Sequence, residues 1–403
     1  MPKLRTGWAL GLVSVLFAPA AHAGPATVQT VDGDSRATIR RIVERGGRLE
    51  IDLGDRQIPA SDVGSIRWPN RGRSAPDFGT PHLFLRNGDE IRGQITGGDV
   101  DSITVHHPAA GALQLPLDRV AAVAYPHDAA ELRRFREQLL PHDPERDQVV
   151  LRTWVRREGA LESIGPDGVS GEWDGLGQAR FSPETALGVR LAPLGPVSNR
   201  TDARTARVEL VDGSILTGRL LGLDNGQLRL QLWATQQTAT LPLETISAVW
   251  FPGGRFRYLS DMEPAEVEQR SQVISVSFPY RRDGCVTGGP LRLGGKRYRK
   301  GLGMHAYTRL RYPLAQRFET LRAVIGLDDT ARQARTVVGT VVFQVLADGK
   351  PLLGEHGLLL STEDPPREIA LDVRGVRDLE LIADFGPSGD SLARAAWADA
   401  LLV

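Results

Sequence analysis

The stretch "KGLGMHAYTRLRYPL", Lys300 to Leu314, has the pattern of one long β-strand entered through glycines. Successive side chains of a strand point to opposite faces, and glycine permits a tight entry into it. One face would carry Met304, Ala306, Thr308, Leu310 and Tyr312, and the other His305, Tyr307, Arg309 and Arg311. The pattern therefore predicts a sheet that is apolar on one side and polar on the other, with His305 at the start of the solvated face.

The chain from Tyr258 to the C-terminus continues in the same manner. The segment "VVFQVLADGKPLL" predicts a hairpin, with Val341, Phe343 and Val345 on one face and Asp348-Gly349 at the turn. About eight such strands over roughly 145 residues are typical of an antiparallel jelly-roll β-sandwich.

Five motifs of this region resemble a known family. They occur in the order "YLSDMEP", "LGGKRYRKGLGMHA", "IGLDD", "VVFQVLADG" and "WADALLV". Over residues 257–403 this order is similar to the NPCBM/NEW2 domain, the carbohydrate-binding domain found beside family 98 glycoside hydrolases. The resemblance implies a galactose-binding-like jelly-roll sandwich and a non-catalytic, extracytoplasmic module that binds glycans, often galactose-containing. The resemblance also implies that a structural calcium ion is possible.

Four residues are candidates for carbohydrate contacts: His305, Tyr307, Lys300 and Trp397. His305 could instead be a plain polar residue or a catalytic group, but catalysis needs a partnered nucleophile or carboxylate, and no motif supplies one. Trp397 could stack on a sugar ring or fill the core, because its neighbours are apolar. Lys300 ends a basic run, which is either a solvated loop or a contact for an acidic glycan.

Asp328 and Asp329 are candidate calcium ligands, because they follow a predicted strand and carry carboxylate oxygens. The alternative is a turn in which both side chains accept backbone hydrogen bonds. The C-terminal motif departs from the family, whose members often carry an acid and a histidine before the tryptophan. Here Ala393, Arg394 and Ala396 occupy that segment.

The N-terminal half repeats one pattern four times, at about 28–69, 82–126, 149–193 and 207–252. The copies end in "IPASDVGSIRWP", "LPLDRVAAVAYP", "FSPETALGVRLAP" and "LPLETISAVWFP". Tight-turn pairs such as Asn87-Gly88 and alternating strands favour small β-units, which resemble Sm-like or SH3-like barrels. Propeller blades are a rival interpretation, but the uneven spacing and a helical linker near 128–140 argue against them.

The N-terminal half shows no metal-ligand spacing, phosphate loop or nucleophile motif. His106-His107 reads as a solvated turn, and Trp68, Tyr125 and Trp250 as core anchors. These units are therefore expected to form a scaffold or a surface for a protein partner.

The first residues predict export. Residues 1–23 contain a basic start, a short apolar run and Ala21-His22-Ala23, which is the layout of a signal peptide cleaved before Gly24. No other segment is apolar and long enough for a transmembrane anchor. Cys285 is the only cysteine, so no internal disulfide forms. The 49 basic and 49 acidic residues give no support for a nucleic-acid partner.

Together these features predict a mostly β, secreted or periplasmic, non-enzymatic protein. Residues 24–256 would form the repeats, and residues 257–403 a sandwich that recognises a glycan. One alternative is a structural or interaction protein of the cell envelope whose sandwich has lost sugar binding. A glycoside hydrolase is a further alternative, but it needs two carboxylates flanking a cleft, and no motif marks such a pair.

Overall fold

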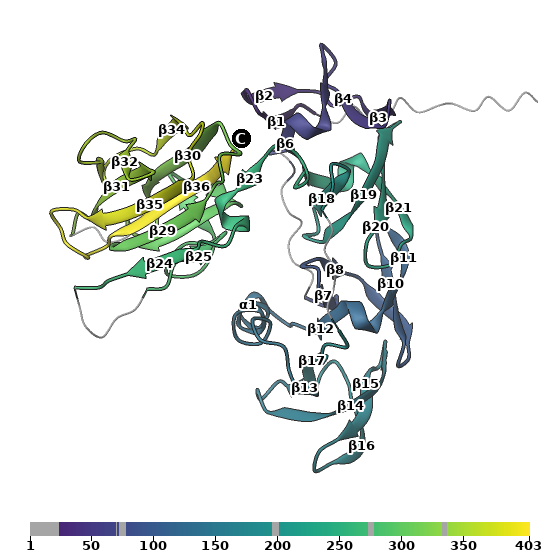
Figure 1. The fold of residues 1–403 in the computed structure, drawn as a ribbon. Coiled ribbons are helices and arrows are strands. Elements are labelled where there is room, and N and C mark those ends of the chain that lie inside the picture. Colours follow the sequence, from purple (N-terminus) through teal and green to yellow (C-terminus); the bar gives the residue numbers. More distant parts are fainter. Residues whose placement is uncertain (1–23, 70, 72–77, 196–200, 273–277, 333–336) are drawn as a thin grey trace, which may run out of the picture.

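The computed structural model describes residues 24–69, 71, 78–195, 201–272, 278–332 and 337–403. The expected signal peptide, residues 1–23, lies outside them. Within these ranges the chain is mostly β, as predicted, with two bodies that adjoin each other (Figure 1). The N-terminal strands form a tall curved array, and the C-terminal strands form a separate sandwich.

The N-terminal array contains four groups of strands. The first is β1 (Ala26–Thr30), β2 (Gly33–Ala37), β3 (Arg41–Arg45), β4 (Arg48–Asp52), β5 (Gln57–Pro59) and β6 (Val63–Arg67). The second is β7 (His82–Leu85), β8 (Glu90–Arg92), β9 (Gln94–Gly98), β10 (Ser102–His107), β11 (Gly111–Pro116) and β12 (Val120–Ala124). The third is β13 (Asp147–Leu151), β14 (Arg156–Gly165), β15 (Gly168–Trp173), β16 (Gly177–Phe181) and β17 (Ala186–Arg190). The fourth is β18 (Thr205–Leu210), β19 (Ile215–Asp224), β20 (Gln227–Leu232), β21 (Thr238–Pro242) and β22 (Ile246–Trp250).

The shared proline-and-acid motif corresponds to a single 3₁₀ turn before the last strand of a group. These turns are η1 (Ala60–Asp62), η2 (Leu117–Arg119) and η3 (Leu243–Thr245). Each follows a proline, which has φ near −60° and so leads the chain into the turn at little cost. The third group has instead a hydrogen-bonded turn, in which the N–H groups of Thr185 and Ala186 donate to the carbonyl of Ser182.

The first strand of each group pairs antiparallel with both the second and the last strand of that group. In the described chain these pairings do not close a ring within any group. The Sm-like or SH3-like barrel therefore stays a prediction. Trp68, Tyr125 and Trp250 are 4–6% exposed, which confirms them as core residues.

The groups do not follow one another in space as they do in sequence. β6 of the first pairs with β22 of the fourth, β8 of the second pairs with β19 of the fourth, and β12 of the second pairs with β17 of the third. The order along the array is thus first, fourth, second, third (Figure 1). This arrangement brings the fourth group, rather than the third, beside the first and the sandwich.

One α-helix, α1 (Ala129–Gln138), covers the second and third groups. Asp128 caps its N-terminus by accepting hydrogen bonds from the N–H groups of Ala130 and Glu131. Phe135 is fully buried and stacks on Phe84, with ring centroids 6.0 Å apart. The helix is therefore held by its apolar face against the array.

The C-terminal body consists of two antiparallel sheets with an apolar core between them. One contains β23 (Arg257–Tyr258), β25 (Arg281–Arg282), β28 (Gly301–His305), β30 (Thr320–Leu327), β34 (Arg367–Asp372) and β36 (Arg394–Leu402). The other contains β24 (Glu266–Gln269), β29 (Thr308–Pro313), β31 (Thr340–Ala347), β32 (Lys350–Pro351), β33 (Leu358–Ser361) and β35 (Asp378–Phe385). A turn η4 (Leu259–Asp261) and a small hairpin of β26 (Leu291–Leu293) and β27 (Lys296–Tyr298) complete it. The predicted sandwich is confirmed.

The stretch from Lys300 to Leu314 is not one strand, which corrects the prediction. β28 pairs with β36 in one sheet, and β29 pairs with β35 in the other. The chain passes between the sheets at Ala306 and Tyr307. Apolar alternation continues across this bend because both strands face the same core, so the pattern cannot distinguish one strand from two.

The two bodies meet around Tyr258. Its hydroxyl donates to Oε1 of Gln29 at 2.6 Å, and its ring packs edge-on against Trp250 at 6.0 Å. Leu401, near the C-terminus, joins the same buried cluster, and Arg67 forms an ion pair with Asp399 at 3.7 Å. Among the described residues, no helix has the length and apolar character needed to span a membrane.

Candidate functional site

His305 ends β28 at the rim of the sandwich, but it is not on a solvated face. Its side chain is buried, with 7% of the residue exposed, because its ring stacks on Phe278 at a centroid distance of 4.4 Å. Nδ1 lies 2.8 Å from the carbonyl oxygen of Ala306, so Nδ1 carries the hydrogen and donates it. Burial lowers the pKa of His305, which keeps the ring neutral at pH 7. Its Nε2 is therefore a hydrogen-bond acceptor.

Tyr307 lies beside His305, and both stay near the rim. Tyr307 is half-buried, and the guanidinium of Arg270 lies 5.2 Å from its ring centroid. Tyr307 and Arg270 also exchange backbone hydrogen bonds of 3.0 and 3.1 Å, which fix their relative position. The structure therefore brings His305, Tyr307, Phe278 and Arg270 to one end of the sandwich.

Two residues of the segment before Trp397, Ala393 and Arg394, border this rim. Arg394 is the cross-strand partner of His305 in the pairing of β28 with β36. Its Nη1 donates to the carbonyl of Thr330 at 2.9 Å, while Ala393 and Ala396 are buried. Residue 394 thus contributes a positive charge beside His305, and the pKa of His305 is lowered further by this charge.

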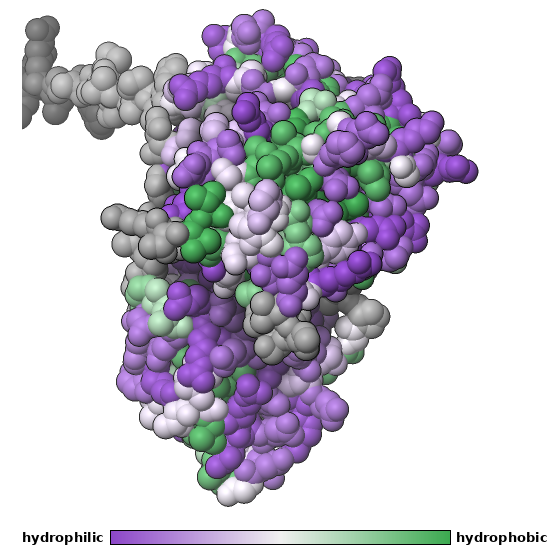
Figure 2. All heavy atoms as spheres, turned by 90° about the vertical axis from the view of Figure 1, so that its left-hand side faces the viewer, coloured by the Kyte–Doolittle hydropathy of each residue, from purple (hydrophilic) through white to green (hydrophobic). Residues whose placement is uncertain are grey.

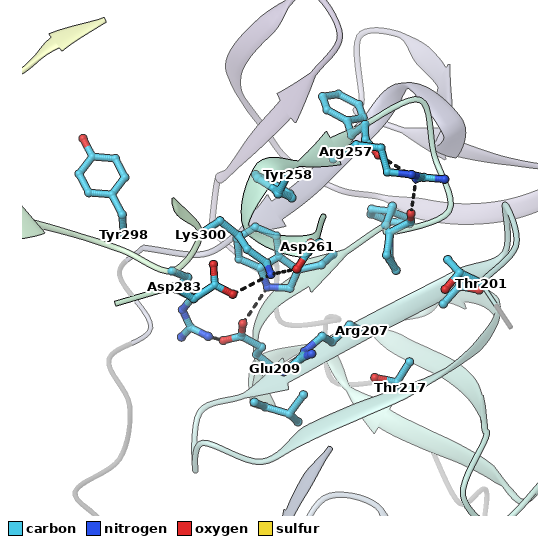
Figure 3. Close-up of a pocket in the computed structure, with 18 of the residues that line it drawn as sticks. Thr201, Arg207, Glu209, Thr217, Arg257, Tyr258, Asp261, Asp283, Tyr298 and Lys300 are labelled. Carbon is cyan, nitrogen blue, oxygen red and sulfur yellow. Dashed lines mark hydrogen bonds and ion pairs between the residues drawn. The ribbon is translucent and has the colours of Figure 1, made fainter. Parts of the chain in front are cut away.

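Lys300 is separated from this rim, at the opposite end of β28. Its Nζ contacts the carboxylates of Asp261, at 2.5 Å, and Asp283, at 2.9 Å. It lines a pocket of about 720 Å³ between the sandwich and the fourth group (Figure 3). The four predicted carbohydrate contacts are therefore not in one site. His305 and Tyr307 lie at the rim, Lys300 lines the pocket, and Trp397 lies in the core.

Trp397 belongs to the core, which corrects its assignment as a sugar contact. It lies in the middle of β36, is 0% exposed, and packs edge-on against Phe343 at 5.2 Å. A ring that is enclosed on both sides cannot stack on a sugar. The core role was the alternative interpretation of the sequence, because the neighbours of Trp397 are apolar.

Asp328 and Asp329 serve the backbone instead of offering oxygens to a cation. Asp328 accepts from the N–H groups of Arg292 and Thr330, and Asp329 accepts from those of Gly294 and Gly295, all at 2.8–3.0 Å. All four carboxylate oxygens thus face N–H donors, which a calcium ion would have to displace. In the described chain, no cluster of three or more His, Cys, Asp or Glu could hold a metal ion.

We expect Asp328→Asn to lower the free energy of unfolding by about 1–3 kcal/mol, because one side-chain N–H₂ would face a backbone N–H in a buried place. Calcium should leave the melting temperature of both proteins unchanged. Thermal melting with calcium and with a chelator measures both effects. A calcium-dependent rise in the wild-type melting temperature would restore the calcium assignment.

The sequence predicted a solvated turn at His106-His107. His106 is exposed, but His107 is buried, which corrects the prediction for His107. Nε2 of His107 lies 3.1 Å from both Ser214 Oγ and Asp212 Oδ2, which gives the three residue types of a hydrolase triad. Nδ1, however, accepts the N–H groups of Ala109 and Ala110. The ring hydrogen therefore sits on Nε2, so the ring cannot take a proton from Ser214 as a base. We interpret this cluster as a buried structural network.

The side of the molecule occupied by the sandwich is mainly hydrophilic, with hydrophobic residues gathered in its upper part (Figure 2). Exposed large apolar side chains of the sandwich are Val267, Val337, Val338 and Leu359. They belong to β24, to β33 and to the segment before β31.

The architecture defines the C-terminal body as a jelly-roll β-sandwich module with a polar rim. Residues 255–403 match the family model of the NPCBM/NEW2 domain, which confirms the resemblance found in the sequence. The match begins two residues before β23 and ends at the last residue of the chain.

One curated relative is a Renibacterium salmoninarum protein named "Putative endo-alpha-N-acetylgalactosaminidase". It is 32% identical over 113 residues, which are 28% of this chain. The match spans only 7% of that protein's length. Its name therefore describes a much larger protein.

Solved structures with some similarity include the CBM51 module of Clostridium perfringens GH95 in complex with methyl-galactose. It is 21% identical, covers 37% of this chain and 99% of that chain, and has a TM-score of 0.32. The tandem CBM51 modules of the family 98 glycoside hydrolase of Streptococcus pneumoniae are 12% identical, cover 80% of this chain and 87% of that chain, and have a TM-score of 0.31.

Proposed function

We propose that this chain is an exported, non-catalytic carbohydrate-binding protein, in which the C-terminal sandwich binds a glycan at the rim around His305. The NPCBM/NEW2 match at residues 255–403 carries this proposal. The rim supplies an acceptor nitrogen on His305, a half-buried ring on Tyr307 and a cation on Arg270. Such a set can accept a hydrogen bond from a sugar hydroxyl and cover an apolar sugar face.

The four strand groups act as a scaffold or as a surface for a protein partner in this proposal. Their cluster of His107, Ser214 and Asp212 is interpreted as a structural network, because the buried ring of His107 accepts backbone N–H groups through Nδ1. The rival function is that of an envelope protein whose sandwich has lost sugar binding. Arg394, which stands beside His305 in place of the family's polar pair, favours this rival.

A glycan array probed with the full mature chain tests the two candidates. Galactose-containing glycans are the first to examine, because the family often binds them. Reproducible capture by a defined glycan group supports the proposal. A chain that melts cooperatively but binds no glycan on the array supports the rival.

Using the best array glycan, we expect His305→Ala to weaken binding about three- to tenfold, because one hydrogen bond is worth about 0.5–1.5 kcal/mol. Binding to the wild type should also weaken in acid, as the pH falls through the lowered pKa of His305. Protonation places a hydrogen on Nε2, so it can no longer accept. Titration calorimetry at several pH values measures both effects.

His356→Ala is the matched control, because His356 is an exposed histidine of the same domain. It should change neither affinity nor its pH dependence. If His305→Ala binds the glycan as the wild type does, the rim around His305 is not the binding site.

A further inference from the structure

The pocket between the two bodies contains a row of side chains on the fourth strand group. Arg207 of β18 lies directly opposite Trp250 of β22 on one side and Thr217 of β19 on the other. Directly opposed residues share a face of the sheet. The N–H of Trp233 donates to the carbonyl of Thr217 at 3.1 Å, which places Trp233 next in the row. All four residues line the pocket.

Arg207 is the charged residue of this row, and its positive charge favours the ionised form of the buried carboxylate of Asp89. Arg207 is half-buried, and within the described residues no hydrogen bond or ion pair holds its guanidinium. The carboxylate of Asp89 is buried and accepts hydrogen bonds from Thr217 and Asn87 rather than from Arg207. Removing a charge from water is unfavourable unless a partner compensates. The position of Arg207 therefore favours an anionic ligand in the pocket.

The surrounding charges also favour an anion. Basic residues of the lining outnumber acidic ones, five to three: Arg207, Arg257, Arg297, Arg299 and Lys300 against Glu209, Asp261 and Asp283. Glu209 forms an ion pair with Arg299 and accepts the indole N–H of Trp250, and Lys300 contacts both aspartates. The acidic side chains are thus already matched by cations of the sandwich.

The two bodies contribute different chemistry (Figure 3). The fourth group supplies a cation on Arg207 and a half-buried indole on Trp233. The sandwich supplies carboxylate acceptors, and Oδ2 of Asp261 has no hydrogen-bond partner among the described residues. Sugar sites combine these three elements: an aromatic face for the ring, acceptors for hydroxyl groups and a cation for an acidic substituent.

We propose that this pocket is a second binding site, distinct from the rim, for an acidic sugar such as a uronic acid. The sugar carboxylate lies on the guanidinium of Arg207, the ring lies against Trp233, and hydroxyl groups donate to Asp261. Because the site needs residues from both bodies, it exists only in the joined chain. Guanidinium binds a planar carboxylate through two parallel hydrogen bonds, which a neutral sugar cannot provide.

The test compares methyl β-D-glucuronide with methyl β-D-glucoside, two probes that differ only in a carboxylate against a hydroxymethyl group. Calorimetry or ligand-observed NMR with the full chain should find the glucuronide bound at least about tenfold more tightly. Arg207→Gln should abolish this preference. Trp233→Ala should weaken binding of both probes.

Arg229→Gln is the control, because it removes the same charge from an exposed position on β20, outside the pocket. It should keep the preference, and so should His305→Ala, which separates this site from the rim. Thermal melting checks that each variant folds. Equal binding of the two probes, no binding of the glucuronide, an unchanged preference in Arg207→Gln, or stronger binding of an acetylated tri-glutamate peptide would each overturn the proposal.

Discussion

Replacing Trp397 by alanine is expected to lower the free energy of unfolding of the sandwich by about 3–5 kcal/mol. Trp397 is fully buried on β36 and packs against Phe343, so truncation leaves a cavity between the two sheets. Domains are typically stable by only about 5–15 kcal/mol, and the loss is therefore a large fraction of the total. Chemical denaturation of the full chain, followed by fluorescence and circular dichroism, measures it.

The control for this prediction is Trp397→Phe, which keeps a ring beside Phe343 and should lose less stability than the alanine variant. Its cavity is smaller, and cavity volume determines much of the loss. A contrary result would be an alanine variant that unfolds like the wild type and loses only glycan affinity. Trp397 would then be a sugar platform, as the sequence alone allowed.

The strands of the sandwich could be predicted from the alternation of apolar and polar residues in the sequence. Val341, Phe343 and Val345 alternate in sequence, and all three are fully buried in β31. Such alternation depends on neighbouring residues only, so a sequence displays it directly. The break within Lys300 to Leu314 could not be read in this way. Met304 and Leu310 face one core from two different sheets, and the alternation stays in phase through the bend.

The position of His305 shows why site predictions were weaker. Alternation correctly separated it from Met304, but it gave no information on what covers the second face of β28. That face is covered by the segment around Cys285 and by Phe278, both distant in sequence. A Cβ added to Gly303 would come within 2.4 Å of the carbonyl oxygen of Gly284. The glycines of the motif therefore permit close packing of this cover, and they do more than shape the strand entry.

Arg207 and Trp233 were missed for a different reason. Each lies in an ordinary strand pattern, and no motif of the fourth group distinguishes it from the other three groups. The pocket arises because the fourth group stands beside the first and the sandwich, and this order follows from strand pairings between groups. Pairings between separate units depend on the whole assembly, so a single sequence does not display them.

Met304→Asp is expected to prevent stable folding of the sandwich at pH 7, and His305→Ala one position away should destabilise it less because alanine introduces no buried charge. Met304 is fully buried in the core between the sheets, opposite Ala395 of β36. An ionised carboxylate there would have no partner, and its desolvation costs several kcal/mol. Met304→Leu, which conserves volume and polarity, should lose less than about 1.5 kcal/mol. Thermal melting of the three variants measures the difference.

The pH dependence gives Met304→Asp a signature that general misfolding would not show. Burial raises the pKa of the introduced carboxyl above its ordinary value of about 3.9, so the folded form takes up a proton more readily than the unfolded form. Stability relative to the wild type must then fall as the pH rises from about 4 toward the raised pKa. The deficit should therefore be smaller at pH 4 than at pH 7. If the variant melts like the wild type at both pH values, residue 304 faces solvent and the assignment of the two faces of β28 is inverted.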